Sequence, residues 1–218
     1  SHGRLANMLR RADRDLKNPE PDQGDIDKLL DLIEQSQRPM VLVGGGVIRS
    51  KGAVPEFRRF IETLDAPVGS TIMGGGACPG DHSLFTGMVG MHGSHASNLA
   101  TAECDLLIAI GCRFSDRVAT DPATFAKNAK IVHIDIDRAE IDKNVPTYHH
   151  IIGDARRVLE LLNEKLPKHD HSEWKAHVFS RKEVPLKKDD ILHPHEILET
   201  IQELTGGDAI IATDVGQH

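Results

Sequence analysis

The stretch that most constrains the fold runs from residue 87 to residue 117. It contains a continuous apolar run over residues 106–110, which Gly111 closes. A short apolar run between breakers is typical of a strand buried on both faces, as in a parallel sheet. A glycine at the end of such a strand lets the backbone turn sharply and lets a ligand approach closely. The stretch therefore indicates a ligand-facing sheet edge; the alternative is an ordinary strand–loop–helix whose glycines serve only the turns.

Similar patterns recur along the whole chain. Short, mostly apolar runs predict strands at 40–43, 68–71, 105–110, 130–137, 151–154 and 209–213. Apolar residues at helical spacing predict helices at 25–33, with Asp25 as the cap, and at 54–64, 158–166 and 194–204; a short helix is expected at 121–126. Strands that alternate with helices predict an α/β fold with a doubly wound parallel sheet, Rossmann-like, with right-handed crossovers.

Composition shifts suggest how the chain is divided. Residues 1–24 are charged and proline-containing, so we expect a linker, followed by a central domain at 25–166. Residues 167–190 are polar, with Trp174 and Phe179 as expected anchors, and are predicted to form a second linker. Residues 191–218 would begin a further, truncated domain. The chain starts at Ser1 without methionine and stops soon after an apolar run, so we expect a piece of a longer protein.

Charge and cysteine usage exclude several classes of function. The formal net charge is −7 with no basic block, which argues against nucleic-acid or membrane-surface binding. No apolar run approaches the roughly 20 residues of a membrane-spanning helix. Three cysteines without CxxC spacing and 13 scattered histidines predict neither a disulfide framework nor a metal site. A cytoplasmic protein is the resulting expectation.

Common nucleotide and hydrolase motifs are missing from the sequence. The dinucleotide pattern G-x-G-x-x-G fails twice, because Arg49 and Pro79 stand where the third glycine belongs. There is no P-loop and no G-x-S-x-G elbow. An ordinary NAD dehydrogenase is therefore disfavoured, and no Ser–His–Asp triad is fixed by any spacing.

What remains is a set of groups at predicted strand ends, which a doubly wound sheet would bring to one edge. Arg113 or Arg117 could pair with a pyrophosphate, and Asp135 could accept ribose hydroxyls. The alternatives are a surface ion pair for Arg113, a helix cap for Asp135 and a plain strand role for Thr71. The groups are Gly45, Thr71, Gly90, Met91, His92, Gly93, Gly111, Cys112, Arg113, Phe114, Asp135, Ile136 and Asp154.

Six motifs carry a resemblance to a known family. In chain order they are VLVGGG, PVGSTIMGGGACPGD, GMVGMHGSHASN, GCRFSDRV, KIVHIDID and TDVGQH. Together they resemble the catalytic large subunits of the acetolactate synthase (acetohydroxyacid synthase) family. The resemblance implies a three-domain thiamine diphosphate enzyme, of which this chain would hold the central FAD-binding domain, a DHS-type nucleotide-binding domain with flanking linkers.

The resemblance also implies roles for individual residues. Asp116 and Arg117 match positions near the mouth of the active site, and Gln217 and His218 match the start of a segment that meets thiamine diphosphate. No catalytic and no metal-binding residue of the family falls on this chain. The family's FAD contacts fall on Gly45, Thr71, Ile72, Val89, Gly90, Met91, His92, Gly111, Cys112, Arg113, Phe114, Ser115, Asp135, Ile136, Asp154 and Ala155.

The activity implied for the full-length enzyme belongs to branched-chain amino acid biosynthesis. It decarboxylates pyruvate and adds the hydroxyethyl unit to a second 2-oxoacid such as 2-oxobutanoate, with Mg²⁺ and with FAD bound without net redox. A homodimer or tetramer with a regulatory small subunit is implied as well. This chain alone is expected to be inactive and to bind FAD weakly at most, because a family arginine that contacts FAD lies upstream. The rivals are another thiamine diphosphate enzyme, such as pyruvate oxidase, and a non-catalytic nucleotide-binding module.

Overall fold

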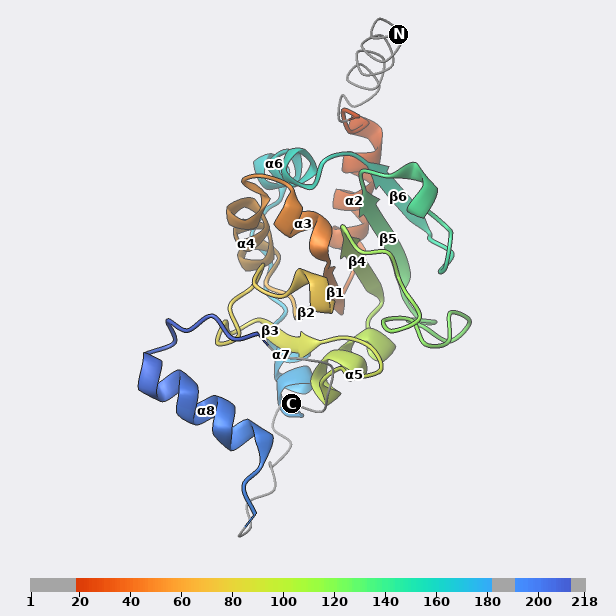
Figure 1. Cartoon of the computed structure of the whole chain (residues 1–218). Helices are drawn as coiled ribbons and strands as arrows, with labels where there is room; N and C mark the ends of the chain where they lie inside the picture. The colour runs from red at the N-terminus through yellow and green to blue at the C-terminus, as the bar shows by residue number, and fades with distance from the viewer. Residues whose placement is uncertain (1–18, 182–190, 213–218) are drawn as a thin grey trace, which may run out of the picture. The chain divides into compact units, whose positions relative to one another are not determined.

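The structure is a computed structural model that describes residues 19–181 and 191–212 (Figure 1). The chain divides into two compact units between residues 183 and 184. The first unit is built around one parallel sheet. Its six strands are β1 (Pro39–Val43), β2 (Val68–Ser70), β3 (Phe85–Met88), β4 (Leu106–Ile110), β5 (Lys130–Asp135) and β6 (His149–Ile152).

The strand order of the sheet is β3-β2-β1-β4-β5-β6, and every neighbouring pair is parallel. The chain runs outward from β1 to β3, returns to the middle, and then runs outward from β4 to β6. This order confirms the predicted doubly wound parallel sheet. The direction of winding reverses between β1 and β4, and such a switch point is where open α/β sheets form a crevice for ligands.

Helices cover both faces of the sheet, which explains why the central strands are apolar throughout. All five residues of β4 are buried, and they alternate between two apolar clusters. Ile108 packs with the helices on one face, and Leu107 with those on the other. The first face holds α2 (Gln23–Gln35), α4 (Ala53–Leu64) and α6 (Ala155–Lys165), and the second holds α5 (His95–Glu103) and α7 (Ser172–Phe179).

Helix α7 lies within the segment that the sequence analysis assigns to a linker at 167–190. Trp174 is only 5% exposed, and its indole Nε1 donates a hydrogen bond to the Pro39 carbonyl oxygen at 2.9 Å. Val178 is fully buried in the same cluster. Residues 172–179 therefore pack on the sheet as part of the first unit, and Trp174 is an anchor as predicted. The domain boundaries themselves remain predictions.

Local details of the first unit differ from the predictions. Helix α2 begins earlier than predicted, because the Asp22 carboxylate accepts hydrogen bonds from the Gly24 and Asp25 amides and so takes the capping role assigned to Asp25. Residues 121–126 form turns instead of a helix, because Ala126 has a φ of 47°, which interrupts helical geometry. Strand β3 was not predicted, since it is short, half-buried and contains Gly87 at a φ of 112°.

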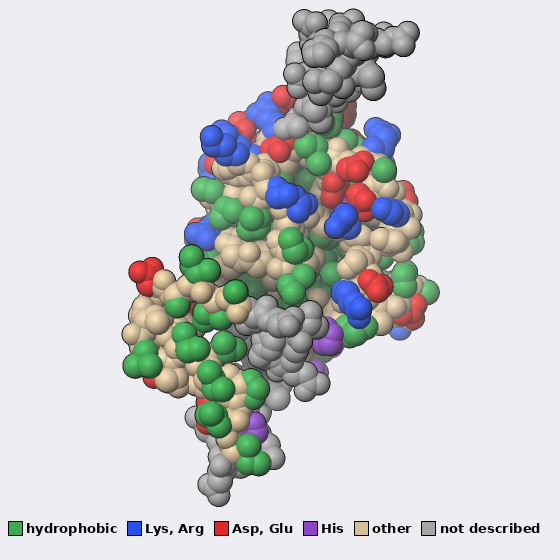
Figure 2. Space-filling model, in the orientation of Figure 1, with side chains coloured by type: hydrophobic (Ala, Val, Ile, Leu, Met, Phe, Trp, Pro, Cys, Tyr) green, Lys and Arg blue, Asp and Glu red, His purple; other side chains and the backbone are tan. Residues whose placement is uncertain are grey.

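The second unit contains α8 (Pro194–Thr205), which confirms the helix predicted there. None of the residues of α8 is buried, and hydrophobic side chains gather on its visible face (Figure 2). Residues 209–212, predicted as a buried strand, are exposed and form no strand, because no described strand pairs with them. On the first unit, acidic and basic side chains are interspersed over the same view. Within the described ranges, no helix is long and apolar enough to cross a membrane.

Candidate functional site

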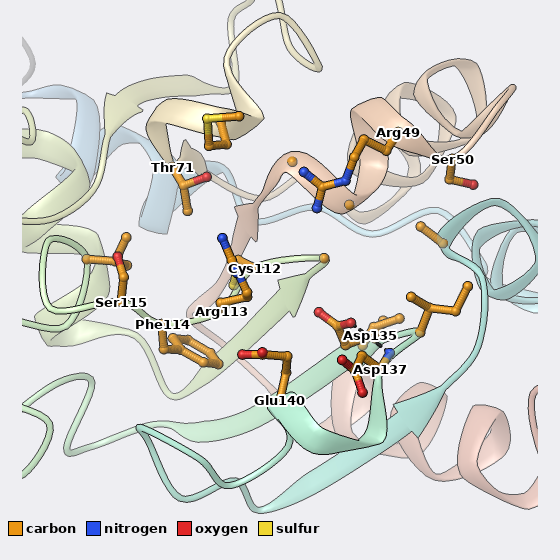
Figure 3. Close-up of a pocket in the computed structure, with 18 of the residues that line it drawn as sticks. Arg49, Ser50, Thr71, Cys112, Arg113, Phe114, Ser115, Asp135, Asp137 and Glu140 are labelled. Carbon is orange, nitrogen blue, oxygen red and sulfur yellow. Dashed lines mark hydrogen bonds between the residues drawn. The ribbon is translucent and has the colours of Figure 1, made fainter.

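The carboxyl edge of the sheet surrounds a cavity of about 840 Å³ (Figure 3). Segments that follow all six strands contribute to its lining, including α3 (Gly45–Arg49) after β1 and the 3₁₀ turns η1 (Ile72–Gly74) and η2 (Arg138–Glu140). A cavity of this size suits a small-molecule ligand or a cofactor. The convergence expected of the strand ends therefore occurs in the structure.

Close contact between two glycine backbones shapes the centre of the cavity. The Gly46 amide donates to the Gly111 carbonyl oxygen at 2.9 Å, which joins the end of β1 to the end of β4. A methyl group on Gly46 would lie 2.6 Å from the Gly111 Cα, and Gly111 has a φ of 61°. Side chains cannot fit between these two segments, so glycine is required at the switch point.

Thr71 fixes the loop that follows β2. Its amide donates to the Val43 carbonyl oxygen at 2.9 Å, and its Oγ1 accepts from the Gly74 amide at 3.1 Å. These bonds hold η1 against the end of β1. The next side chains, Ile72 and Met73, are 79% and 64% exposed and form an apolar rim.

Asp135 is a buried acid of the cavity, and two neighbouring groups hold its carboxylate. Its Oδ1 accepts from the Asp137 amide at 2.9 Å, and its Oδ2 lies 3.7 Å from the His133 Nε2. Burial disfavours the ionised carboxyl, but the contacts with His133 and with the backbone amides outweigh it, and the pKa of Asp135 lies below its ordinary value. Asp135 is therefore a carboxylate at neutral pH, and its contact with His133 helps to fix the position of its side chain.

Charges are separated across the cavity. In Figure 3 the guanidinium groups of Arg49 and Arg113 point into it from α3 and from the loop after β4. Asp135, Asp137 and Glu140 lie together on the side of β5 and η2. A ligand that carries both an anionic group and hydrogen-bond donors would match this arrangement.

Cys112 lines the cavity but is only 3% exposed. Burial raises the pKa of its thiol to about 12. The thiol is therefore protonated at neutral pH and is not a nucleophile.

The cavity brings together most of the predicted site residues. Gly90, Met91 and Asp116 are not among its lining; Gly90 and Met91 instead hold the loop after β4, since the Met91 amide donates to the Arg117 carbonyl oxygen at 2.9 Å. Gln217 and His218 lie outside the described residues. The predicted residues that line the cavity are Gly45, Thr71, Ile72, Val89, His92, Gly111, Cys112, Arg113, Phe114, Ser115, Arg117, Asp135, Ile136, Asp154 and Ala155.

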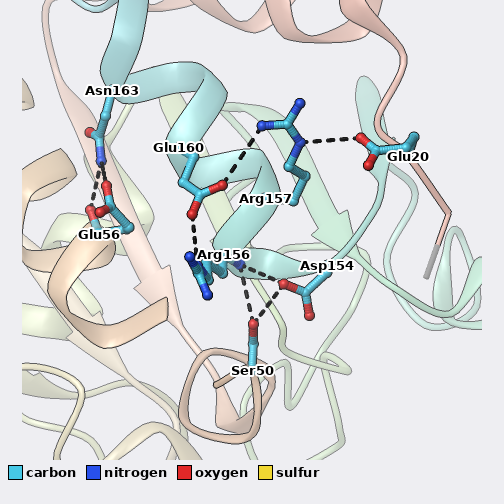
Figure 4. Close-up of polar contacts among 8 residues, drawn as sticks. All are labelled: Glu20, Ser50, Glu56, Asp154, Arg156, Arg157, Glu160 and Asn163. Carbon is cyan, nitrogen blue, oxygen red and sulfur yellow. Dashed lines mark hydrogen bonds and ion pairs between the residues drawn. The ribbon is translucent and has the colours of Figure 1, made fainter. Parts of the chain in front are cut away.

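Sequence reasoning missed several lining residues. The sequence analysis noted Arg49 only as the residue that interrupts a glycine motif, and Ser50 was given no role in the site. Ser50 donates to the Asp154 carboxylate at 2.8 Å, and Asp154 also caps α6 through the Arg156 amide at 3.1 Å (Figure 4). This network ties the loop after β1 to the loop after β6. The lining residues that were missed include Arg49, Ser50, Lys51, Asp137 and Glu140.

The fold and the cavity define a class: a doubly wound α/β domain with a large, charge-separated cavity at the carboxyl edge of its sheet. Residues 26–162 match the family described as "Thiamine pyrophosphate enzyme, central domain". The chain belongs to this family.

Known relatives of the chain include several acetolactate synthases. The chain is 45% identical over 206 residues to the probable acetolactate synthase large subunit of Methanocaldococcus jannaschii, covering 88% of this chain and 35% of the relative. It is 43% identical over 198 residues to the acetolactate synthase large subunit of Lactococcus lactis, covering 88% and 34%. It is 41% identical over 208 residues to acetolactate synthase 2, chloroplastic, of Nicotiana tabacum, covering 91% and 31%. The chain spans about a third of the length of these relatives, and the resemblance in the motifs is confirmed.

Proposed function

We propose that the cavity at the carboxyl edge of the sheet binds the adenine dinucleotide FAD. The observation that carries this proposal is the convergence of segments after all six strands on one cavity of about 840 Å³, with Arg49 and Arg113 apart from Asp135, Asp137 and Glu140. The glycine backbones at its centre leave room for a ligand to approach the chain. The donor set also fits, because diphosphates pair with guanidinium groups and ribose hydroxyls with carboxylates.

The roles of the lining residues follow from their chemistry. Asp135 accepts hydrogen bonds from the ribose hydroxyls, and Arg113 pairs with the diphosphate. Thr71 holds the loop that places Ile72 against the ligand. The remaining contacts come from Val89 and His92 and from the segments at 111–115, 135–136 and 154–155, with Arg117 and its neighbour Asp116 at the mouth of the active site. When bound in this position, FAD would supply a flavin that undergoes no net redox change in the reaction.

For the whole protein we propose acetolactate synthase activity: condensation of pyruvate with a second 2-oxoacid such as 2-oxobutanoate. Thiamine diphosphate and Mg²⁺ would be its further cofactors. Within the described parts of this chain, no group of three His, Cys, Asp or Glu residues is arranged to hold a metal ion. As the family resemblance implies, we propose that Mg²⁺ is held by a part of the full-length enzyme that this chain does not cover. A homodimer or tetramer with a regulatory small subunit, in the cytoplasm, completes the proposal.

Calorimetric titration of the 218-residue chain with FAD and with ADP tests the cofactor. We expect binding of both ligands, with FAD weaker than about 1 μM, which corresponds to roughly −8 kcal/mol. Nanomolar FAD affinity would contradict the expected dependence on the neighbouring domain. Binding of ADP without any flavin uptake would favour a plain nucleotide-binding module. Absence of binding for both ligands would overturn the proposed site.

A further inference from the structure

Arg49 is a cation in the lining of the cavity, and neither the glycine motifs nor the family resemblance gives it a role. It is the last residue of α3, the short helix that follows β1, and it lines the cavity together with Arg113. We propose that Arg49 is a second diphosphate-binding residue. Its guanidinium binds the diphosphate from the β1 side of the cavity, and the guanidinium of Arg113 binds it from the β4 side. This inference rests on the proposed function and names a specificity-determining residue of the same site.

The backbone after β1 is built so that the Arg49 side chain folds back over the sheet edge. A methyl group on Gly45 would lie 3.1 Å from the Arg49 Nη1 and 3.0 Å from the Met73 Cβ. The guanidinium therefore packs directly over the Gly45 backbone, at the carboxyl end of the central strand. Arg49 is exposed, and in Figure 3 its guanidinium nitrogens point into the cavity.

Neither guanidinium has a counter-ion in the parts of the chain that the structure describes. The ion pairs and side-chain hydrogen bonds of these parts include other arginines, such as Arg156 with Glu160 at 2.7 Å and Arg157 with Glu20 at 3.2 Å, but not Arg49 or Arg113. Two cations that face one cavity repel each other, and an anion between them removes this cost. A diphosphate offers each guanidinium its own pair of oxygens.

The position of the pair in the fold agrees with this assignment. Arg49 follows β1 and Arg113 follows β4, and these adjacent strands flank the switch point of the sheet. The crevice at a switch point is where open α/β sheets bind the diphosphates of nucleotides. The carboxylates of Asp135 and Asp137 lie on the β5 side and repel an anion, so the diphosphate is confined to the Arg49–Arg113 side, and the ribose to the Asp135 side.

The test compares ADP with adenosine on wild-type and variant 218-residue chains by calorimetry or by ligand-observed NMR. Arg49→Gln should weaken ADP about tenfold and leave adenosine within about twofold, because one charge-assisted contact to the diphosphate is lost. Arg49→Lys, which keeps the charge but loses the planar fork, should fall between the two. Arg38→Gln is the matched control, since Arg38 is an exposed arginine that directly precedes β1, at the opposite edge of the sheet.

The possible outcomes separate the two proposals. If the wild-type chain binds ADP no better than adenosine, or binds neither, the proposed diphosphate site is wrong. If it prefers ADP and Arg49→Gln keeps that preference in full, the role of Arg49 is wrong while the proposed function stands. An equal loss in Arg49→Gln and Arg38→Gln would show that only the net charge matters, which also contradicts the inference. Circular dichroism of each variant tests whether it folds. If Arg49→Gln does not fold, the ADP and adenosine affinities of Arg49→Lys decide the role of Arg49.

Discussion

The Nε2 of His133 lies 3.7 Å from the Oδ2 of Asp135 and 2.8 Å from the Cys112 carbonyl oxygen. Both neighbours of this nitrogen are acceptors, so it carries the hydrogen. His133 is fully buried, and the Phe114 ring packs edge-on against it with centroids 4.9 Å apart. One side chain thus positions the acid at the end of β5 and the loop after β4.

His133→Phe should raise the pKa of the Asp135 carboxyl. In the wild-type chain this pKa lies below the ordinary 3.8, so the carboxylate stabilises the fold fully above that value, and this contribution is lost as the pH falls through the folded pKa. Without His133, only the backbone amides oppose the effect of burial on the pKa of Asp135. Carbon-13 NMR titration of the Asp135 carboxyl measures the change. His82→Phe is the control, because His82 contacts Glu62 and not Asp135. An unchanged Asp135 titration in His133→Phe would contradict this account.

Gly46→Ala should destabilise the fold by about 2 kcal/mol, since overpacking of a tight contact typically costs 1–3 kcal/mol. The added methyl would meet the Gly111 backbone at 2.6 Å, although alanine by itself favours the helix α3. Gly80→Ala is the matched control, because a methyl at Gly80 meets nothing within 4 Å. Urea denaturation of the two variants measures the difference. Equal stabilities would mean that the ends of β1 and β4 are not in contact.

Trp174→Phe should lower the free energy of unfolding by about 1–2 kcal/mol, because the hydrogen bond to the Pro39 carbonyl oxygen is lost within a buried site. Urea denaturation followed by circular dichroism measures the difference, because the variant has no tryptophan. In the wild-type chain Trp174 is the one tryptophan, so its fluorescence reports on α7 directly. We expect wild-type emission typical of a buried indole, shifting to that of an exposed indole in the same transition that unfolds the sheet. An exposed emission maximum in the native chain would support a plain linker at 167–190.

The cysteines should resist thiol reagents in the native chain. All three are buried, and burial raises the pKa of both Cys104 and Cys112 to about 12. Because the thiolate is the reactive form, Ellman's reagent at pH 8 should react slowly until the chain is unfolded, and then with three thiols. Rapid labelling of Cys112 in the native chain, identified by mass spectrometry, would show that the cavity is open to that side.

The strands of the sheet centre could be predicted because parallel strands covered on both faces are continuously apolar, as in β1 and β4. The same reasoning missed β3, whose edge position leaves it half-buried and tolerant of Gly87. Asp135 was predicted because an acid at the end of a buried strand is visible in the sequence. Arg49 was not, since its reach into the cavity depends on α3 and on the bare backbone of Gly45, which only the folded chain reveals.

The central claim is that the carboxyl edge of the sheet, around the β1–β4 switch point, holds an adenine nucleotide. Amide chemical-shift mapping of the 218-residue chain with ADP tests it most directly. We predict that the shifts concentrate on Gly45, Gly111, Arg113 and Asp135, at the ends of β1, β4 and β5. Shifts centred on Arg38, Asp105 and Lys130, at the opposite edge of the sheet, would contradict the account.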